Sequence, residues 1–403
     1  MTAEATLPPP RSLYLHLPFC RRRCAYCDFA IAVAGEELQD RYLAAILQEL
    51  AAVSRSGAAS RPLDTVHLGG GTPSLLGGSR LVRLLEAVAA DFRLASGCEV
   101  TLEANPEEVS PAAAREWARL GVTRVSLGVQ SLSDRTLRWL GRGHDAATGL
   151  RALEWLRDSS LPQVSCDLMF AIPGQSTRTF LEGLELVLRV HPDHLSCYEL
   201  TLEPGTVTQR RVAAGRAAAV PETQALEQLR RGRERIEAAG LLRYEVSNYG
   251  RPGCESRHNL NYWRGGTYLA AGAGAHGFLG AAEAAALQLA AGTGVGVRYW
   301  HYRAAATYAK AVESGGLGIR ASEQLDHSQL SLERLALGLR LTQGLEIAEE
   351  GRLGASRRLA ARGWMEVDGR RVRATPGGME ILDRLTLELA AADQPGGSRR
   401  PKT

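Results

Sequence analysis

Three cysteines crowded into one short loop constrain this chain more than any other feature. Cys20, Cys24 and Cys27 follow the alternating apolar run 13–17, which predicts a β-strand that ends at Pro18. A structural zinc site takes four ligands, usually from two Cys or His pairs, and no second pair follows nearby. The loop therefore favours an iron–sulfur cluster that keeps one iron open to an outside ligand.

Arg21, Arg22 and Arg23 stand between the first two cysteines. Cations beside thiolates lower the thiol pKa and offset the negative charge of a cluster, so we expect these arginines to do both. The alternative interpretation is a set of structural or adventitious cysteines, which leaves the close spacing after a strand unexplained.

Composition excludes several classes of protein. A chain of 403 residues with 45% apolar content can bury one large core and a smaller one. Its net charge of +4 is too small to predict nucleic acid or an anionic membrane as partner. We expect neither a membrane span of ~20 apolar residues nor a signal peptide. Seven cysteines, an odd number, favour a reducing compartment, so we expect a cytoplasmic protein.

Strand and helix patterns alternate through the first 250 or so positions. The helical patterns are 36–53, 79–92, 111–119, 146–157, 176–190 and 222–239. Strand patterns precede or follow them at 13–17, 65–68, 99–104, 124–130, 163–170 and 194–200, with a short run at 244–247. This alternation predicts an α/β fold with right-handed crossovers and a parallel sheet. Six repeats fit a partial (β/α)6 barrel better than a closed eight-stranded one.

The strands carry one apolar and one polar face. Glu103, Gln130 and Asp167 belong to the polar faces, near the carboxyl ends of their strands, where parallel α/β folds place active sites. They predict a shared cavity, although polar side chains that merely fill the barrel would give the same pattern. The triple glycine 69–71 ends the second strand and allows close approach of a ligand, or simply a tight turn.

The spacing C-x3-C-x-Y-C resembles the signature of radical S-adenosylmethionine (radical SAM) proteins. The flanking residues YLHLPFC and CDF are similar to the coproporphyrinogen III oxidase-like branch of that superfamily. The resemblance implies a partial barrel, a [4Fe–4S] cluster on Cys20, Cys24 and Cys27, and SAM on the open iron. It also implies a set of SAM-binding positions: Tyr14, Gly70, Gly71, Thr72, Glu103, Gln130, Arg142 and Asp167.

A second motif, HNxxYW, begins at His258 and ends at Trp263. Histidine can ligate heme iron and aromatic rings can cover a flat macrocycle, but chemistry alone favours a capping loop with packed aromatics. The motif resembles one typical of the HemW-type heme chaperones within the same branch. That resemblance implies heme binding, with His258 as the candidate axial ligand.

The resemblance leaves two candidate members of the branch, an oxidase and a heme chaperone. The oxygen-independent coproporphyrinogen III oxidase typically has a further cysteine where this chain has Phe29, and a longer N-terminal arm than the residues before Cys20. Together with HNxxYW, these differences favour a heme chaperone that delivers heme to an acceptor protein, and we expect no catalytic residues for decarboxylation. SAM cleavage stays open. A respiratory protein is one candidate acceptor, and a homodimer is one candidate assembly.

The C-terminal third differs in pattern from the barrel. We expect the barrel over 1–280, an Ala/Gly-rich connection over 281–297, a smaller domain over 298–395 and a disordered tail over 396–403. Two helices, a hairpin with an Asp-Gly turn and a last helix predict a winged-helix-like α+β domain. DNA binding is the alternative, but without a strongly basic stripe we favour a lid on the barrel.

Overall fold

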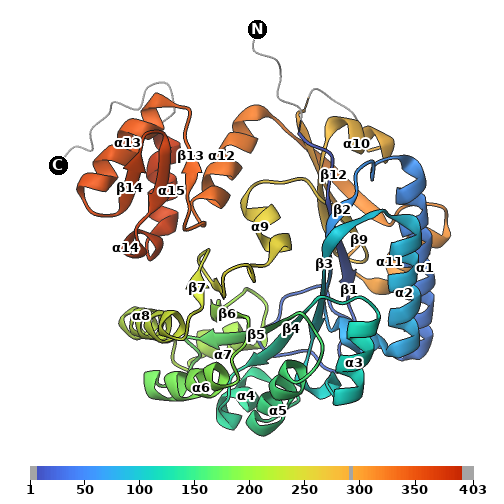
Figure 1. The fold of residues 1–403 in the computed structure, drawn as a ribbon, viewed down its shortest axis with the longest axis horizontal. Helices are drawn as coiled ribbons and strands as arrows, with labels where there is room; N and C mark the ends of the chain where they lie inside the picture. The colour runs from blue at the N-terminus through green and yellow to red at the C-terminus, as the bar shows by residue number, and fades with distance from the viewer. Residues whose placement is uncertain (1–6, 290–293, 393–403) are drawn as a thin grey trace.

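The computed structural model describes residues 7–289 and 294–392 (Figure 1). Six strands in its first half alternate with helices, as the sequence predicts. The strands are β1 (Ser12–Leu17), β2 (Leu63–Gly70), β3 (Leu94–Ala104), β4 (Arg124–Gln130), β5 (Gln163–Phe170) and β6 (His194–Glu199). The helices that connect them are α1 (Glu36–Ser56), α2 (Gly78–Asp91), α3 (Pro111–Arg119), α4 (Asp134–Leu140), α5 (Ala146–Arg157) and α6 (Thr177–Arg189).

These six strands are parallel neighbours in one sheet of order β7-β8-β6-β5-β4-β3-β2-β1-β9. Strand β9 (Leu269–Ala271) extends the sheet in parallel beside β1, while β8 (Asn248–Gly250) pairs antiparallel with both β6 and β7 (Leu242–Arg243). The two outer strands, β7 and β9, do not pair with each other in the described chain. The predicted partial (β/α)6 barrel is therefore confirmed.

One expected strand is absent. The run 244–247 forms the connection between β7 and β8 instead of a core strand. The carboxylate of Glu245 accepts hydrogen bonds from the backbone N–H of Ser247, at 2.8 Å, and from the side chain of Asn248, at 2.6 Å. These local bonds turn the chain sharply, an effect that strand periodicity does not report.

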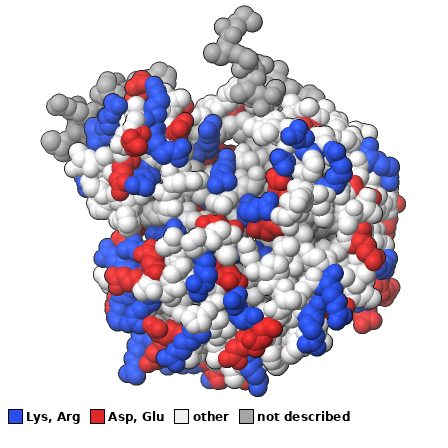
Figure 2. All heavy atoms as spheres, viewed as in Figure 1, with Lys and Arg blue, Asp and Glu red and all other residues white. Residues whose placement is uncertain are grey.

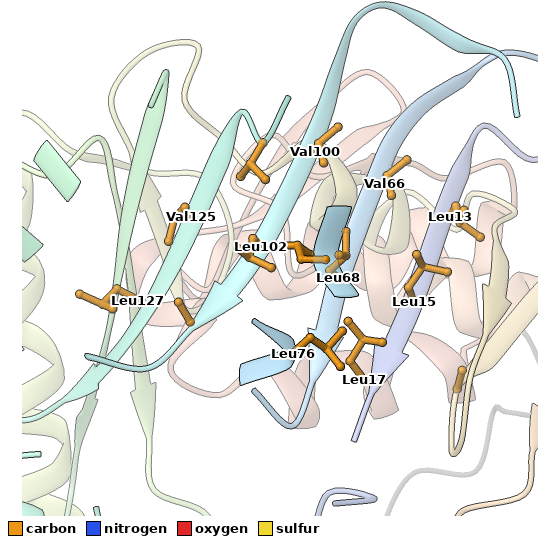
Figure 3. Packing of buried hydrophobic residues seen from close by; sticks show 14 of the residues in the cluster. Leu13, Leu15, Leu17, Val66, Leu68, Leu76, Val100, Leu102, Val125 and Leu127 are labelled. Atoms are coloured by element: carbon orange, nitrogen blue, oxygen red, sulfur yellow. The ribbon is translucent and has the colours of Figure 1, made fainter. Parts of the chain in front are cut away.

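The core of the barrel lies where the apolar faces of the strands meet the helices. Figure 3 shows these side chains on neighbouring strands; they include Leu13, Leu15, Val66, Leu68, Val100, Leu102, Val125 and Leu127. Burying one such side chain contributes about 1.5–3 kcal/mol. Several helices begin at a capping residue: Ser110, Ser133 and Ser176 each accept a hydrogen bond from a backbone N–H three residues further on.

The chain beyond β6 first adds further helices and strands to the part of the molecule that contains the barrel. It forms α7 (Val207–Ala213), α8 (Glu222–Ala238), α9 (Arg257–Trp263), β10 (His276–Gly280), α10 (Ala281–Ala286), β11 (Gly296–His301), α11 (Ala305–Glu313) and β12 (Ile319–Leu325). Strands β10, β11 and β12 form a separate antiparallel sheet. The short helix α10 and strand β11 occupy part of the expected connection 281–297, whose residues 290–293 lie outside the described chain.

A smaller unit ends the described chain. It comprises α12 (His327–Gly338), β13 (Leu345–Glu346), α13 (Glu350–Ala361), β14 (Met365–Asp368), β15 (Arg371–Ala374), α14 (Pro376–Met379) and α15 (Leu382–Ala391). Its buried residues form their own cluster, whereas Val297, Tyr299 and Tyr308 belong to the cluster of the barrel. We therefore propose that this unit begins near Asp326 rather than at 298. The expected tail 396–403 lies outside the described residues.

The surface carries charges of both signs. Figure 2 shows basic and acidic side chains interspersed over one face of the molecule. Within the described ranges, no helix combines the length and the apolar content that crossing a membrane requires.

Candidate functional site

The three cysteines of the N-terminal loop surround one pocket. The loop starts where β1 ends, and backbone hydrogen bonds from Cys20 to Ala32 (3.0 Å) and from Ala32 to Pro18 (2.7 Å) close its base. Cys20, Cys24 and Cys27 are free thiols, partly exposed, and all three line a cavity of about 480 Å³. The strand delivers the thiols to the carboxyl-end edge of the sheet, as the sequence predicts.

These thiols fit a cluster better than a single metal ion. In the described residues, no three His, Cys, Asp or Glu side chains are placed to hold one metal ion. A tetrahedral zinc site would need that convergence. In a [4Fe–4S] cluster each cysteine binds a different iron, so thiols spread around a cavity suit it. Bound there, the cluster would supply electron transfer and an open iron.

The expected effect of the arginine run is wrong in one respect. Arg21 forms an ion pair with Glu108 at 2.6 Å, whereas Arg23 donates to the carbonyl of Ile31 at 3.2 Å and its charge opposes only part of the rise in the pKa of Cys27. Burial raises the pKa of Cys20 and of Cys27, instead of the expected lowering. Desolvation therefore has a larger effect on the pKa of these two thiols than the arginines next to them in sequence.

A different cation reaches the thiols. Arg142, which follows α4, donates to the Sγ atom of Cys24 at 3.5 Å and to Asn105 Oδ1 at 2.5 Å. Asn105 in turn donates to Thr72 Oγ1 at 2.8 Å, and Thr72 donates to Cys20 Sγ at 3.5 Å. This chain of hydrogen bonds ties the cysteine loop to the ends of β2 and β3. Sequence reasoning missed Asn105, although its position two residues after Glu103 was a usable signal.

The remaining pocket residues come from the carboxyl ends of the strands. The cavity that holds the thiols is also lined by most of the predicted SAM positions: Gly70, Gly71, Thr72, Glu103, Gln130, Arg142 and Asp167. Gln130 adopts a positive φ of 67° at the end of β4, a conformation that non-glycine residues rarely take and that is frequent at functional sites. The shared cavity expected from the polar strand faces therefore exists.

Two carboxylates in the pocket have opposite pKa shifts. Burial alone would raise the pKa of Glu103, but the hydrogen bond from His67 Nε2 and the backbone N–H of Gly70, both at 3.0 Å, lower it. Burial raises the pKa of Asp167 to about 6, and the charge of Glu103 adds to this shift. Hydrogen bonds from Ser126 and Ser196 only partly oppose it. The pocket thus holds one firmly ionised carboxylate and one that titrates near neutral pH.

The glycine turn after β2 has no room for side chains. A Cβ atom on Gly71 would lie 2.6 Å from the carbonyl carbon of Pro18 and 2.7 Å from the carbonyl oxygen of Phe19. Gly70 has a φ of +112°, and a Cβ there would meet the ring of His16 at 2.6 Å. The backbone of this turn can therefore pack against the cysteine loop and still face the cavity.

Gly71→Ala should displace the cysteine loop, because the obstructing atoms belong to the backbone and cannot rotate away. We expect a stability loss of about 1–3 kcal/mol and a clear drop in bound iron and sulfide after anaerobic purification. Thermal unfolding and iron analysis measure the two effects. Gly35→Ala is the matched control, since its Cβ meets nothing within 4 Å. Equal cluster content in both variants would contradict the proposed packing.

Tyr14 and His258 lie outside this cavity. They line a small adjoining cavity of about 210 Å³, which shares Glu103 and Asp167 with the cavity that holds the cysteines. The hydroxyl of Tyr14 contacts His16 Nδ1 at 3.0 Å, and Tyr14 lines the adjoining cavity together with Glu103. The structure therefore groups the predicted SAM positions around one pocket, except Tyr14.

His258 is almost completely buried, with 1% of its surface exposed. Its Nδ1 contacts Thr65 Oγ1 at 2.7 Å, its Nε2 contacts the hydroxyl of Tyr262 at 2.8 Å, and its ring stacks on His67 at 5.0 Å. Burial lowers its pKa well below the ordinary value, so the ring is neutral. Ligation of heme iron by His258 would require breaking one of these two hydrogen bonds.

Known proteins are similar to this chain in sequence and in fold. The family model of the radical SAM superfamily matches residues 14–187. The chain is 37% identical to the heme chaperone HemW of Mycobacterium tuberculosis over 388 residues, which cover 94% of this chain and 95% of that protein. It is 40% identical to the heme chaperone HemW of Escherichia coli over 271 residues, covering 67% and 70% of the two chains.

A solved structure shows the same fold at lower sequence identity. The coproporphyrinogen III oxidase HemN of Escherichia coli superimposes with a TM-score of 0.78 at 21% identity. The superposition covers 95% of this chain and 91% of the oxidase. At this identity the likeness concerns the architecture alone.

Proposed function

Because this chain belongs to the HemW heme chaperones of the radical SAM superfamily, we propose that it binds heme and passes it to an acceptor protein. The observation that carries the proposal is the 37% identity that extends over 94% of this chain and 95% of its mycobacterial relative. The partner that this function needs is an apoprotein with an empty heme site. A respiratory protein and a homodimeric carrier are our finer proposals.

We propose further that Cys20, Cys24 and Cys27 hold a [4Fe–4S] cluster, with SAM in the adjoining part of the pocket. The thiols and the polar strand ends line one cavity, which supports this arrangement. SAM is a sulfonium cation, and the carboxylates of Glu103 and Asp167 offer it negative charge. The backbone of Gly70 and Gly71 and the guanidinium of Arg142 complete the proposed contacts.

The alternative function is oxygen-independent coproporphyrinogen decarboxylation. The oxidase shares the fold, but sequence identity falls from 37–40% for the heme chaperones to 21% for the oxidase. At the position where the oxidase typically carries a further cysteine, this chain has Phe29, whose side chain is 60% exposed beside the cysteine loop. These differences favour the chaperone.

A side-by-side assay on the anaerobically purified, cluster-loaded protein separates the two functions. We expect one heme bound per chain, held until an apoprotein acceptor is added and then transferred to it. Under the same conditions, with a reductant and SAM, we expect coproporphyrinogen to stay unchanged. Absorbance in the Soret region follows heme, and chromatography follows porphyrin products. Robust decarboxylation with SAM consumed in step would overturn the chaperone and restore the oxidase.

A further inference from the structure

A second, larger cavity lies between the barrel side and the C-terminal unit. Its volume is about 740 Å³, within the range of small-molecule and cofactor sites. Residues of α9, β10 and β11 line one side, and residues of α12 and of the segment around β13 line the other. This cavity shares no lining residue with the cavity that holds the cysteines.

The walls of this cleft are largely apolar and aromatic. Tyr262 and Trp263, the last two residues of the HNxxYW motif, form part of the barrel side together with Tyr268 and Phe278. The opposite side includes Leu330 of α12. Aromatic side chains on one side of the cleft and aliphatic ones on the other suit a flat, apolar ligand, because stacking and hydrophobic burial both favour it.

The cleft also offers positive charge. Arg264 and Arg334 are exposed, and neither guanidinium group forms a hydrogen bond or ion pair with the other described residues. The carboxylates in the lining are already engaged, since each is close to an arginine. The pairs are Glu333 with Arg298 at 2.8 Å, Glu346 with Arg371 at 3.4 Å and Glu349 with Arg352 at 3.3 Å. Two guanidinium groups are therefore left for an anionic ligand.

One imidazole in the cleft is exposed. His327 is the first residue of α12, and its ring forms no hydrogen bond with any described residue. It contrasts with His258, whose two ring nitrogens are both engaged. His258 instead contacts the hydroxyl of Tyr262 from behind the cleft wall. His258 is thus suited to position Tyr262, and His327 is suited to bind a metal.

We propose that this cleft is the heme site of the protein. The aromatic wall and α12 enclose the macrocycle, Arg264 and Arg334 pair with the propionates, and His327 ligates the iron. The proposal rests on the proposed heme chaperone function and gives it a location. A flat, apolar, dianionic metal complex matches the rings, the two guanidinium groups and the imidazole together.

Titration of the full chain with hemin and, separately, with iron-free protoporphyrin tests the site. His327→Ala should weaken hemin binding ~tenfold or more and shift the Soret band, while leaving protoporphyrin binding unchanged. Arg264→Glu with Arg334→Glu should weaken both ligands by a similar factor. His276→Ala controls for loss of a histidine outside the cleft. Arg115→Glu with Arg119→Glu on α3 controls for the change of charge.

The outcomes separate this proposal from the function on which it rests. Wild-type affinity and spectrum in both the His327 and the arginine variants would overturn the cleft as the site, while heme binding by the wild type would leave the chaperone function standing. A wild-type protein that binds no hemin would overturn both. Unchanged iron–sulfur content and melting temperature in every variant would show that the losses of ligand affinity arise in the cleft and not from misfolding.

Discussion

Alanine in place of Cys20, Cys24 or Cys27 is expected to abolish the iron–sulfur cluster, with each single substitution sufficient. Three thiols already leave one iron without a protein ligand, so a cluster held by two has no stable coordination. The hydrogen bonds from Thr72 to Cys20 and from Arg142 to Cys24 cannot replace a missing thiolate. Iron and sulfide analysis and the visible absorbance after anaerobic reconstitution measure the loss.

Cys254→Ala is the matched control for these variants. Cys254 is also a partly exposed free thiol, but it lies outside the pocket that the three cysteines share. Its substitution should leave iron and sulfide at the wild-type level. If all three loop variants retained full iron and sulfide, the cluster assignment would be wrong.

Asp167→Ala is expected to weaken SAM binding roughly tenfold or more, since removing a buried charged partner costs ~1–3 kcal/mol. The carboxylate lines the pocket on β5 and accepts a hydrogen bond from Ser126 at 3.1 Å. Calorimetry on the cluster-loaded protein measures the affinity. Asp158→Asn, which removes an exposed carboxylate outside the pocket, should bind SAM like the wild type.

The raised pKa of Asp167 adds a pH signature. Burial moves the pKa from its ordinary value of 3.8 to about 6, so the group is neutral at pH 5 and charged at pH 7. Because SAM is a cation, wild-type affinity should rise as the pH increases through 6, and Asp167→Asn should lose this dependence. Folding responds with the opposite sign: as the pH rises from about 4 to about 6, ionisation of this buried group lowers stability. Equal SAM affinity at pH 5 and 7 in the wild type would contradict the assignment.

Local patterns in the sequence predicted much of the pocket. Each strand has a period of two, so the polar phase that carries Glu103, Gln130 and Asp167 had to face away from the helices. Parallel strands bring their carboxyl ends to one edge, so these side chains had to meet the loop that follows β1. The cysteine spacing and the glycine turn are equally local. For this reason the candidate site could be predicted from the sequence alone.

Contacts between segments that are distant in the chain could not be predicted from local sequence patterns. Asn105 links Arg142 to Thr72 only because the loops after β2, β3 and α4 converge. The arginines next to Cys20 were expected to act on the thiols, yet Arg21 pairs with Glu108, a residue far along the chain. A side chain can therefore interact with a residue far along the chain rather than with the residues beside it in sequence.

The sequence by itself determined the open parallel barrel, the three thiols on one loop and the polar strand ends around them, because periodicity and spacing are properties of consecutive residues. Only the tertiary structure decided that His258 is buried and that His327 is exposed. His258 is enclosed by Thr65, Tyr262 and His67, while His327 lines the cleft where the C-terminal unit meets the barrel. Burial and hydrogen-bond partners arise from segments that are distant in the chain, and no local pattern encodes them.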